Sequence, residues 1–311
     1  MRFSTLVLGT MGNVLTFAAG AASGGTTPVD MLTLKQPIER DGTLVFEFGD
    51  TYLAVNPLHG ARITSLRVAG HELLHLTGAS NFADAFGSTF WPSPQTWPWP
   101  PPAELDTQPY AQQVDARGAV TLTSRAHEGT CLQVTKRFSA DLTREALLLE
   151  YGMSNIGTEP ISWAPWEITR LPADGLAFWP TGGAPFGDRP LRHQTTAGHT
   201  WCAPAQTDGE GKLFADGSGG YLAYASAGGI LIKQFADVLP SAVAPNEAEV
   251  ELYVNAEHSY VEVENQGAYA SIAPGETTRW QVTWYARQLP PGMTVTAGNA
   301  DLIAFVRETL Q

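Results

Sequence analysis

The sequence has few cysteines, few charged residues and, beyond its first two dozen residues, no long apolar run. Of 311 residues, only two are cysteine and 16 % are charged. The 18 Lys and Arg residues against 31 Asp and Glu give a formal net charge of -13 at pH 7. Such a charge repels a phosphate backbone or an anionic membrane surface over most of the molecule. Nucleic acid is therefore a poor candidate partner, whereas an uncharged sugar is unaffected by this field.

The N-terminal residues 1–22 resemble a short secretory signal. Met1 and Arg2 precede a mostly apolar stretch from Phe3 to Ala18, and small residues follow, as expected for a cleavable signal. No later run approaches the ~20 apolar residues that a membrane helix needs. We therefore predict a periplasmic or secreted protein without a membrane span, with a disordered cytosolic leader as the alternative.

The two cysteines are Cys131 and Cys202. In an oxidising compartment they are candidates for a disulfide, which requires that their Cα atoms lie close together. The sequence does not give that separation. A disulfide and two separate buried thiols therefore both remain open.

Short runs in which apolar and polar residues alternate fill most of the chain. This pattern is typical of antiparallel sheets with one solvent-exposed face. The runs cover residues 43–48, 52–55, 62–68, 120–123, 132–138, 146–154, 250–254, 260–263 and 279–285. Residues 208–212 have the composition of a hairpin or surface turn rather than of a calcium loop. Helical periodicity is convincing only over residues 299–310, where Asn299 is placed to cap the helix. We predict one all-β domain over residues 28–311 that includes this helix.

The segment from Phe90 to Pro102 carries three tryptophans among several prolines. Proline removes ladder donors and fixes φ, so the pattern predicts a stiff, extended loop rather than a sheet interior. An indole offers a flat apolar face that suits the C–H face of a sugar ring. We predict a ligand platform that includes Trp91, Gln95, Trp97 and Trp99. The alternative is a loop, made rigid by its prolines, whose tryptophans cover the hydrophobic core.

Three segments resemble galactose mutarotase-like proteins. Residues 55–74 resemble their opening hairpin, in which a Gly-Ala-(Arg)-Ile-x-Ser-Leu strand precedes a Gly-x-Glu-Leu-Leu turn. Residues 262–285 resemble their ending, in which Glu-x-Gln precedes a Leu-x-Pro-Gly-Glu turn, and residues 150–161 resemble a central strand with its Asn-x-Gly turn. The resemblance covers residues 43–289. It implies a β-supersandwich of two large antiparallel sheets with a sugar-sized groove on one concave face.

The resemblance also implies a base for proton transfer. In the family, a glutamate of the Glu-x-Gln motif takes the proton from the anomeric hydroxyl. The matching position here is Glu264, with Gln266 beside it. Glu262 lies two residues earlier and therefore on the same face of the strand, where repulsion between the two carboxylates would raise one pKa.

The chain departs from the family at the acid. The family places a histidine in an Asn-His-x-Tyr-Phe-x-Leu segment, whereas residues 164–171 here contain none. Glu167 is a candidate proton donor if neighbouring indoles such as that of Trp166 raise its pKa. Arg170 is a candidate partner for Glu167 or Glu264, or a clamp for a sugar carboxylate. The alternative is a structural salt bridge between Glu167 and Arg170.

These observations predict a protein that acts on or binds carbohydrate. The histidines and cysteines lack metal-ligand spacing, and the sequence has no phosphate loop or dinucleotide fingerprint, so we predict no metal or cofactor. The main hypothesis is an exported protein that binds a sugar and catalyses proton-transfer isomerisation, as an aldose 1-epimerase does. The alternatives are a non-catalytic carbohydrate-binding protein and a component of a polysaccharide lyase or hydrolase acting on uronate glycans. The residues that we expect to contact the sugar are Trp91, Gln95, Trp97, Trp99, Trp166, Arg170 and Gln266.

Overall fold

The computed structural model describes residues 36–78, 82–187 and 189–311, whose strands form two antiparallel sheets. Sheet 1 consists of β1 (Ile38–Arg40), β2 (Thr43–Phe48), β3 (Thr51–Asn56), β4 (Arg62–Val68), β5 (His71–Glu72), β6 (Ser88–Ser93), β11 (Ile161–Leu171), β15 (Gly211–Ala215), β18 (Val250–Val254), β19 (Val261–Gln266) and β20 (Ala270–Ile272). Sheet 2 consists of β7 (Ala111–Val114), β8 (Val120–Thr123), β9 (Leu132–Asp141), β10 (Ala146–Asn155), β12 (Leu176–Pro180), β13 (His193–Thr196), β14 (His199–Cys202), β16 (Tyr221–Ser226), β17 (Gly229–Phe235) and β21 (Thr277–Arg287).

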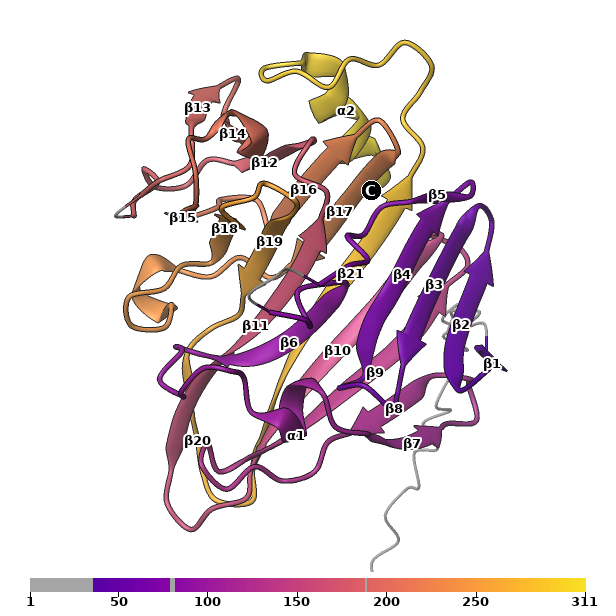
Figure 1. The fold of residues 1–311 in the computed structure, drawn as a ribbon, viewed down its shortest axis with the longest axis vertical. Coiled ribbons are helices and arrows are strands. Elements are labelled where there is room, and N and C mark those ends of the chain that lie inside the picture. Colours follow the sequence, from indigo (N-terminus) through magenta and orange to yellow (C-terminus); the bar gives the residue numbers. More distant parts are fainter. Residues whose placement is uncertain (1–35, 79–81, 188) are drawn as a thin grey trace, which may run out of the picture. The chain divides into compact units, whose positions relative to one another are not determined.

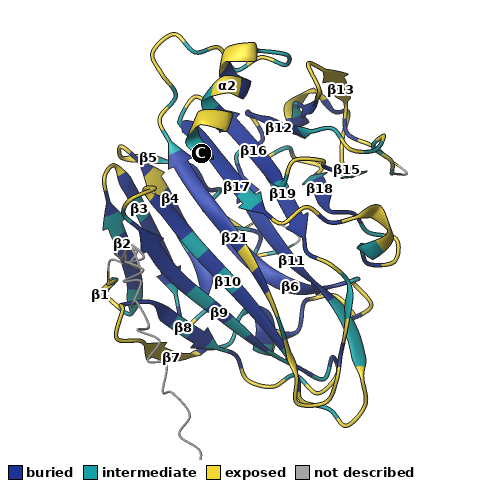
Figure 2. Ribbon diagram, turned by 180° about the vertical axis from the view of Figure 1, so that it is seen from behind, coloured by how far each residue is buried: buried dark blue, intermediate teal, exposed yellow. Residues whose placement is uncertain are grey.

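The strand order interleaves distant parts of the chain. Sheet 1 runs β1-β2-β3-β4-β6-β11-β19-β18-β15, with β5 beside β4 and β20 beside β11. Sheet 2 runs β13-β14-β12-β16-β17-β21-β10-β9-β8-β7. Sheet 1 lies in front of sheet 2 in Figure 1, and sheet 2 is the nearer one in Figure 2. The predicted all-β architecture of two large antiparallel sheets is confirmed.

Alternation along the strands builds the core between the sheets. In β9, Leu132, Val134 and Phe138 are buried in this core, whereas Gln133 and Thr135 are only half-buried. A shift of one residue would move the whole apolar set to the other face. The ladder with β10, in which Phe138 lies opposite Leu149, therefore has one favourable register.

Helix α2 (Ala300–Thr309) covers the other face of sheet 2. The side chain of Asn299 accepts hydrogen bonds from the backbone N–H groups of Asp301 and Leu302, as predicted from the sequence. Leu302 and Val306 pack with Phe178, whose neighbour Trp179 points into the core between the sheets. The predicted C-terminal helix and its docking on the sandwich are confirmed. The remaining short helices of the described residues are α1 (Ala103–Asp106), η1 (Pro204–Gln206) and η2 (Pro240–Ala242).

The tryptophan- and proline-rich segment begins as a strand, contrary to the prediction of a loop throughout. Ser88 to Ser93 form the buried strand β6. On its β11 side the strand pairs over its full length, with Pro92 opposite Pro165. On its β4 side the only pairing in the described chain joins Ile63 to Ser88. Pro92 is accommodated because this part of β6 has no second strand that needs its N–H.

Three further predictions concern the chain's location and its thiols. The predicted signal segment, residues 1–22, lies outside the described residues. Within the described parts of the chain, no helix combines the length and apolar character of a membrane span. Cys131 and Cys202 are separate free thiols, and burial raises the pKa of the Cys202 thiol to about 12. The structure therefore contains two separate thiols rather than a disulfide.

Candidate functional site

The pairing of β11 with β19 gathers polar side chains on the face of sheet 1 that points away from sheet 2, here called the outer face. In β11, Trp166 and Arg170 point to the outer face, while Glu167 between them points into the core. Trp166 lies directly opposite Gln266, and Arg170 lies opposite Glu262. Residues that lie directly opposite in a ladder share a face. The Glu-x-Gln motif and Trp166 are therefore neighbours on the outer face.

A cavity of about 340 Å³ lies over these strands. It is lined by Phe82, Trp91, Gln95, Trp99, Trp166, Lys212, Tyr253, Tyr260 and Glu262. Six of these nine residues are aromatic, and two are charged. Predominantly apolar walls with a few convergent polar groups are typical of small-molecule sites.

The three tryptophans of the predicted platform have different roles. Trp91 lines the cavity and makes edge-to-face contacts with Trp97, Trp99 and Trp166 at centroid distances of 5.6, 6.0 and 5.5 Å. Trp97 is buried, donates to the carbonyl oxygen of Pro92, and does not line the cavity. Trp99 is 52 % exposed and lines the cavity. The ligand-platform and core-covering interpretations therefore each describe part of the segment.

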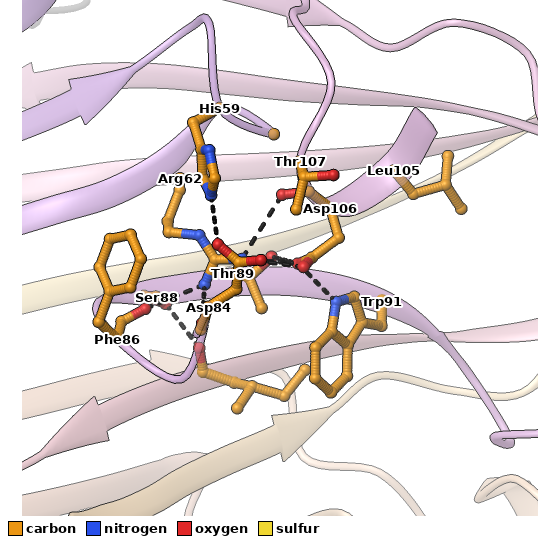
Figure 3. A network of polar contacts seen from close by, with 12 residues as sticks. His59, Arg62, Asp84, Phe86, Ser88, Thr89, Trp91, Leu105, Asp106 and Thr107 are labelled. Atoms are coloured by element: carbon orange, nitrogen blue, oxygen red, sulfur yellow. Dashed lines mark hydrogen bonds and ion pairs between the residues drawn. The ribbon is translucent and has the colours of Figure 1, made fainter. Parts of the chain in front are cut away.

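A buried ion pair fixes the position of Trp91 (Figure 3). Asp106, the last residue of α1, accepts hydrogen bonds from Trp91 Nε1 at 2.9 Å and from Thr89 Oγ1 at 2.8 Å. Arg62 Nη2 donates to both carboxylate oxygens of Asp106, at 2.9 and 3.0 Å. Burial by itself would raise the pKa of Asp106, but Arg62 and the two neutral donors lower it below its usual value. The carboxylate thus stays ionised and holds the indole.

The motif glycine Gly60 allows α1 to approach this ion pair. Its φ is +62°, and a Cβ at this position would lie 1.8 Å from the carbonyl oxygen of Asp106. Arg62 also donates through Nη1 to the carbonyl oxygens of Asp84 and Phe86, at 2.9 and 3.0 Å. The same guanidinium therefore fixes the segment that follows Phe82 in the cavity wall.

The predicted base, Glu264, lies beneath the cavity floor. Its Oε2 accepts from Trp166 Nε1 at 2.7 Å and from Lys212 Nζ at 3.2 Å. Lys212 Nζ also pairs with Glu251 Oε2 at 2.6 Å, and Gln266 Nε2 donates to Glu251 Oε1 at 2.7 Å. The side chain of Glu264 is 0 % exposed, whereas that of Lys212 is 27 % exposed. Glu264 and Gln266 are thus buried and absent from the cavity lining, whereas Lys212 lines it.

The carboxylate that lines the cavity is Glu262. Its side chain is 13 % exposed and accepts from Arg170 Nε at 2.8 Å. Burial raises the pKa of Glu262 to about 7; Arg170 opposes this rise, and the negative charge of Glu264 adds to it. A carboxylate with such a pKa is suited to accept a proton near neutral pH.

The candidate acid Glu167 does not reach the cavity. It lies in the core between the sheets, where Lys233 Nζ is 2.9 Å from Oε1 and Trp284 Nε1 donates to the same oxygen at 3.0 Å. The Tyr151 hydroxyl donates to its other oxygen. The physical reason is its position in β11, since adjacent residues of a strand point to opposite faces. The predicted pairing of Glu167 with Arg170 is replaced by these contacts.

Arg170 is enclosed by the cavity wall rather than exposed to a ligand. The side chain is 1 % exposed, and its guanidinium lies 5.6 Å from the ring centroid of Trp91 and 5.9 Å from that of Phe82. Its partner is Glu262, not Glu264. The expected clamp for a sugar carboxylate is therefore occupied by a carboxylate of the protein itself.

Sequence reasoning missed several residues of the cavity. Lys212 belongs to a stretch interpreted as a turn, although β15 begins at Gly211. Tyr253 lies within a predicted strand, and the alternation of that strand places Tyr253 and Glu251 on one face. Tyr260 directly precedes β19 and belongs to the alternating run predicted at residues 260–263, which places it on one face with Glu262. Phe82, in contrast, lies outside the strands of the structure, so no periodicity indicates where it points.

One family model matches the sequence of this chain. A family model described as a domain of unknown function (DUF4380) matches residues 93–287. The matched range contains Trp99, Trp166, Lys212 and Glu262 of the cavity. No curated protein matches the chain significantly.

Comparison with solved structures shows the fold. The Slr1438 protein of Synechocystis sp. PCC 6803 has a TM-score of 0.57 at 11 % identity, over 83 % of this chain and 99 % of that one. A galactose mutarotase-like protein of Lactobacillus casei ATCC 334 has a TM-score of 0.56 at 14 % identity, over 79 % and 100 %. A galactose mutarotase related enzyme of Lactobacillus acidophilus has a TM-score of 0.53 at 10 % identity, over 81 % and 99 %. The fold is thus galactose mutarotase-like, as the sequence resemblance predicted.

Proposed function

This chain belongs to the family described as a domain of unknown function (DUF4380), and we propose that it binds a carbohydrate in the aromatic cavity on the outer face of sheet 1. The observation that carries the proposal is the lining of this cavity, in which six aromatic rings surround Lys212, Glu262 and Gln95. Aromatic faces suit the C–H surface of a sugar, and the three polar groups suit its hydroxyls. The mutarotase-like fold supports the proposal.

The charges around the cavity favour a neutral sugar. Lys212 is paired with Glu251 and Glu264 beneath the floor, and Arg170 is paired with Glu262. Three carboxylates therefore stand against two cations above pH ~7, where Glu251, Glu262 and Glu264, whose pKa values burial raises to about 7, are mostly ionised. A uronate would add a further negative charge next to this cluster, at an electrostatic cost. A neutral pyranose carries no such charge.

Binding is tested by titration of the intrinsic tryptophan fluorescence. Neutral sugars such as glucose, galactose, mannose and xylose are compared with galacturonate. A neutral sugar is expected to change the emission because Trp99 and Trp166 line the cavity. Trp99→Ala should weaken binding by ~1 kcal/mol or more through lost stacking area. Leu58→Ala removes an apolar side chain that is more accessible, at 62 % exposed against 52 % for Trp99, and absent from the cavity lining, as a control. Equal affinities in both variants would refute the site.

A second candidate function is proton-transfer isomerisation of the bound sugar. One observation favours it: Glu262 lines the cavity and has a pKa raised to about 7. General bases act best when their pKa lies near the working pH, and contribute ~10²–10⁴-fold. The role that the family resemblance gives to Glu264 would then belong to Glu262. Lys212, held by Glu251 and Glu264, would stabilise negative charge on the sugar.

Isomerisation is tested by polarimetry on freshly dissolved aldoses. If the protein speeds the approach to anomeric equilibrium, Glu262→Gln should lower the rate at least ~10²-fold, while the titration still shows sugar binding. An unchanged rate in this variant would remove Glu262 from the role of base. No acceleration by the unaltered protein would leave binding alone as the function.

A further inference from the structure

A second cavity adjoins the first along the outer face of sheet 1. It has a volume of about 390 Å³ and is lined by Arg189, Glu210, Gly211, Lys212, Phe214 and Tyr253. Lys212 and Tyr253 line both cavities. We propose that the two cavities are adjacent subsites for one neutral glycan of at least two rings. This inference rests on the proposed sugar site and extends it from a monosaccharide to an oligosaccharide.

The two cavities share one pair of lining residues, Lys212 and Tyr253, here called the shared pair. Lys212 in β15 lies directly opposite Tyr253 in β18. The ammonium of Lys212 lies 4.9 Å from the ring centroid of Trp166 in the first cavity and 5.2 Å from that of Phe214 in the second. A ligand that crosses the shared pair would meet an aromatic ring on each side. The lysine is therefore placed to contact two consecutive sugar rings.

The second cavity has its own aromatic platform. Phe214 stacks on Phe186 with a centroid distance of 5.4 Å and an interplanar angle of 14°. Two backbone hydrogen bonds of 2.9 Å, one in each direction, hold these residues together. Phe186 is nevertheless 52 % exposed, so a large ring is fixed in position while much of it faces solvent. A fixed, exposed aromatic ring beside a cavity is a suitable stacking surface for a ligand.

Polar groups around the platform match sugar hydroxyls. The Tyr253 hydroxyl donates to Glu210 Oε1 at 2.6 Å, which leaves the other carboxylate oxygen of Glu210 able to accept. Arg189 is exposed, and its carbonyl oxygen accepts from the Lys212 N–H at 3.0 Å. Arg189 and Glu210 carry opposite charges, so the second cavity, like the first, does not select for an anionic ring.

The experiment compares matched sugars of one and two rings by tryptophan fluorescence titration. Glucose is paired with cellobiose and with maltose, xylose with xylobiose, mannose with mannobiose, and galactose with a β-1,4-linked galactobiose. For at least one pair, the disaccharide should bind about tenfold more tightly than its monosaccharide. Phe186→Ala and Arg189→Ala should each reduce this ratio toward one. Leu58→Ala, at a residue absent from both linings, should retain the ratio.

The outcomes separate the two proposals. Binding with equal affinity for one ring and two rings would overturn the second subsite while supporting the sugar site. A disaccharide preference that survives both Phe186→Ala and Arg189→Ala would also overturn it, because the second ring would then lie elsewhere. Absence of binding by every sugar would overturn the sugar site and, with it, this inference. Both substituted residues are exposed, so folding of the variants is expected and is checked by their unfolding midpoints.

Discussion

Trp166 donates from Nε1 to Glu264 Oε2 at 2.7 Å, and this bond joins the cavity floor to the charged cluster beneath it. The indole lines the cavity, while its N–H is held by a carboxylate whose side chain is 0 % exposed. Glu264 therefore acts on the site through Trp166. This relationship gives the Glu-x-Gln motif a structural role in addition to any chemical one.

Replacing Glu264 should affect binding according to whether an acceptor remains. Glu264→Gln keeps an oxygen that can accept from Trp166, so sugar affinity should change little. Glu264→Leu removes the acceptor and leaves a buried indole N–H unpaired, at a cost of ~1–3 kcal/mol. Part of this cost should appear as weaker sugar binding in fluorescence titrations. Equal affinities in the two variants would show that the hydrogen bond does not position the floor.

Stability should fall as the pH rises from 6 to 8. Burial is the main cause that raises the pKa values of Glu251, Glu262 and Glu264, each to about 7, from ordinary values near ~4.3. A carboxyl with a raised pKa contributes stability that is present below its unfolded pKa and is lost as the pH passes its folded pKa. His75 and His199, whose pKa values burial lowers, act in the opposite sense, mainly below pH ~6.5. Lys136, whose pKa burial lowers to about 7, also acts in the opposite sense above pH ~7 and offsets part of the loss.

Between pH 6 and 8, the free energy of unfolding should fall by at least ~1 kcal/mol, because a shift of one pKa unit corresponds to ~1.4 kcal/mol. Urea unfolding at pH 6, 7 and 8 measures it. Glu251→Gln should flatten the dependence, since an amide does not titrate. A free energy of unfolding that rises over this range would contradict the account of the cluster.

Asp106→Asn should destabilise the protein by ~3 kcal/mol. The substitution leaves the buried guanidinium of Arg62 without its counter-charge, and breaking a buried pair has a cost of this size. The matched control is Asp115→Asn, because Asp115 pairs with Arg137 at the surface, where both side chains are at least one-third exposed. Exposed pairs are worth ~0–1 kcal/mol. Similar losses for the two variants in urea unfolding would argue against the role of the buried pair.

Glu167→Gln should lower stability without weakening sugar binding. The change removes the charge that faces Lys233 between the sheets, so a loss of ~2–4 kcal/mol is expected. Below the unfolding transition, the variant should bind the sugar that binds the unaltered protein most tightly with unchanged affinity, because Glu167 points away from the cavity. Weaker sugar binding by a fully folded Glu167→Gln variant would show that Glu167 contributes to the sugar site.

The fold could be predicted because its signals are local. The hairpin at residues 55–74 and the ending at residues 262–285 each carry a recognisable motif, and Asn299 marks the helix start. The site was predicted only in part. Alternation shows that Trp166 and Glu167 point to opposite faces, but not which face is outward.

The missed cavity residues depend on contacts between distant strands. Lys212 and Tyr253 meet Trp166 only because β15 and β18 extend sheet 1 beyond β19, and no motif in either strand reports this order. Asp106 is separated from its partner Arg62 by 44 residues and ends a helix of four residues. A buried ion pair of this kind leaves no periodic signal in the sequence.

The contrast between Trp91 and Trp99 has a practical consequence for changing selectivity. The indole of Trp91 is held by a hydrogen bond to Asp106 and by contacts with other tryptophans. Trp99, in contrast, is 52 % exposed and belongs to a segment that the buried Trp97 anchors. Position 99 is consequently the natural point at which to install other side chains and generate a panel of altered specificities, since each replacement would reshape the rim while the scaffold below stays as it is.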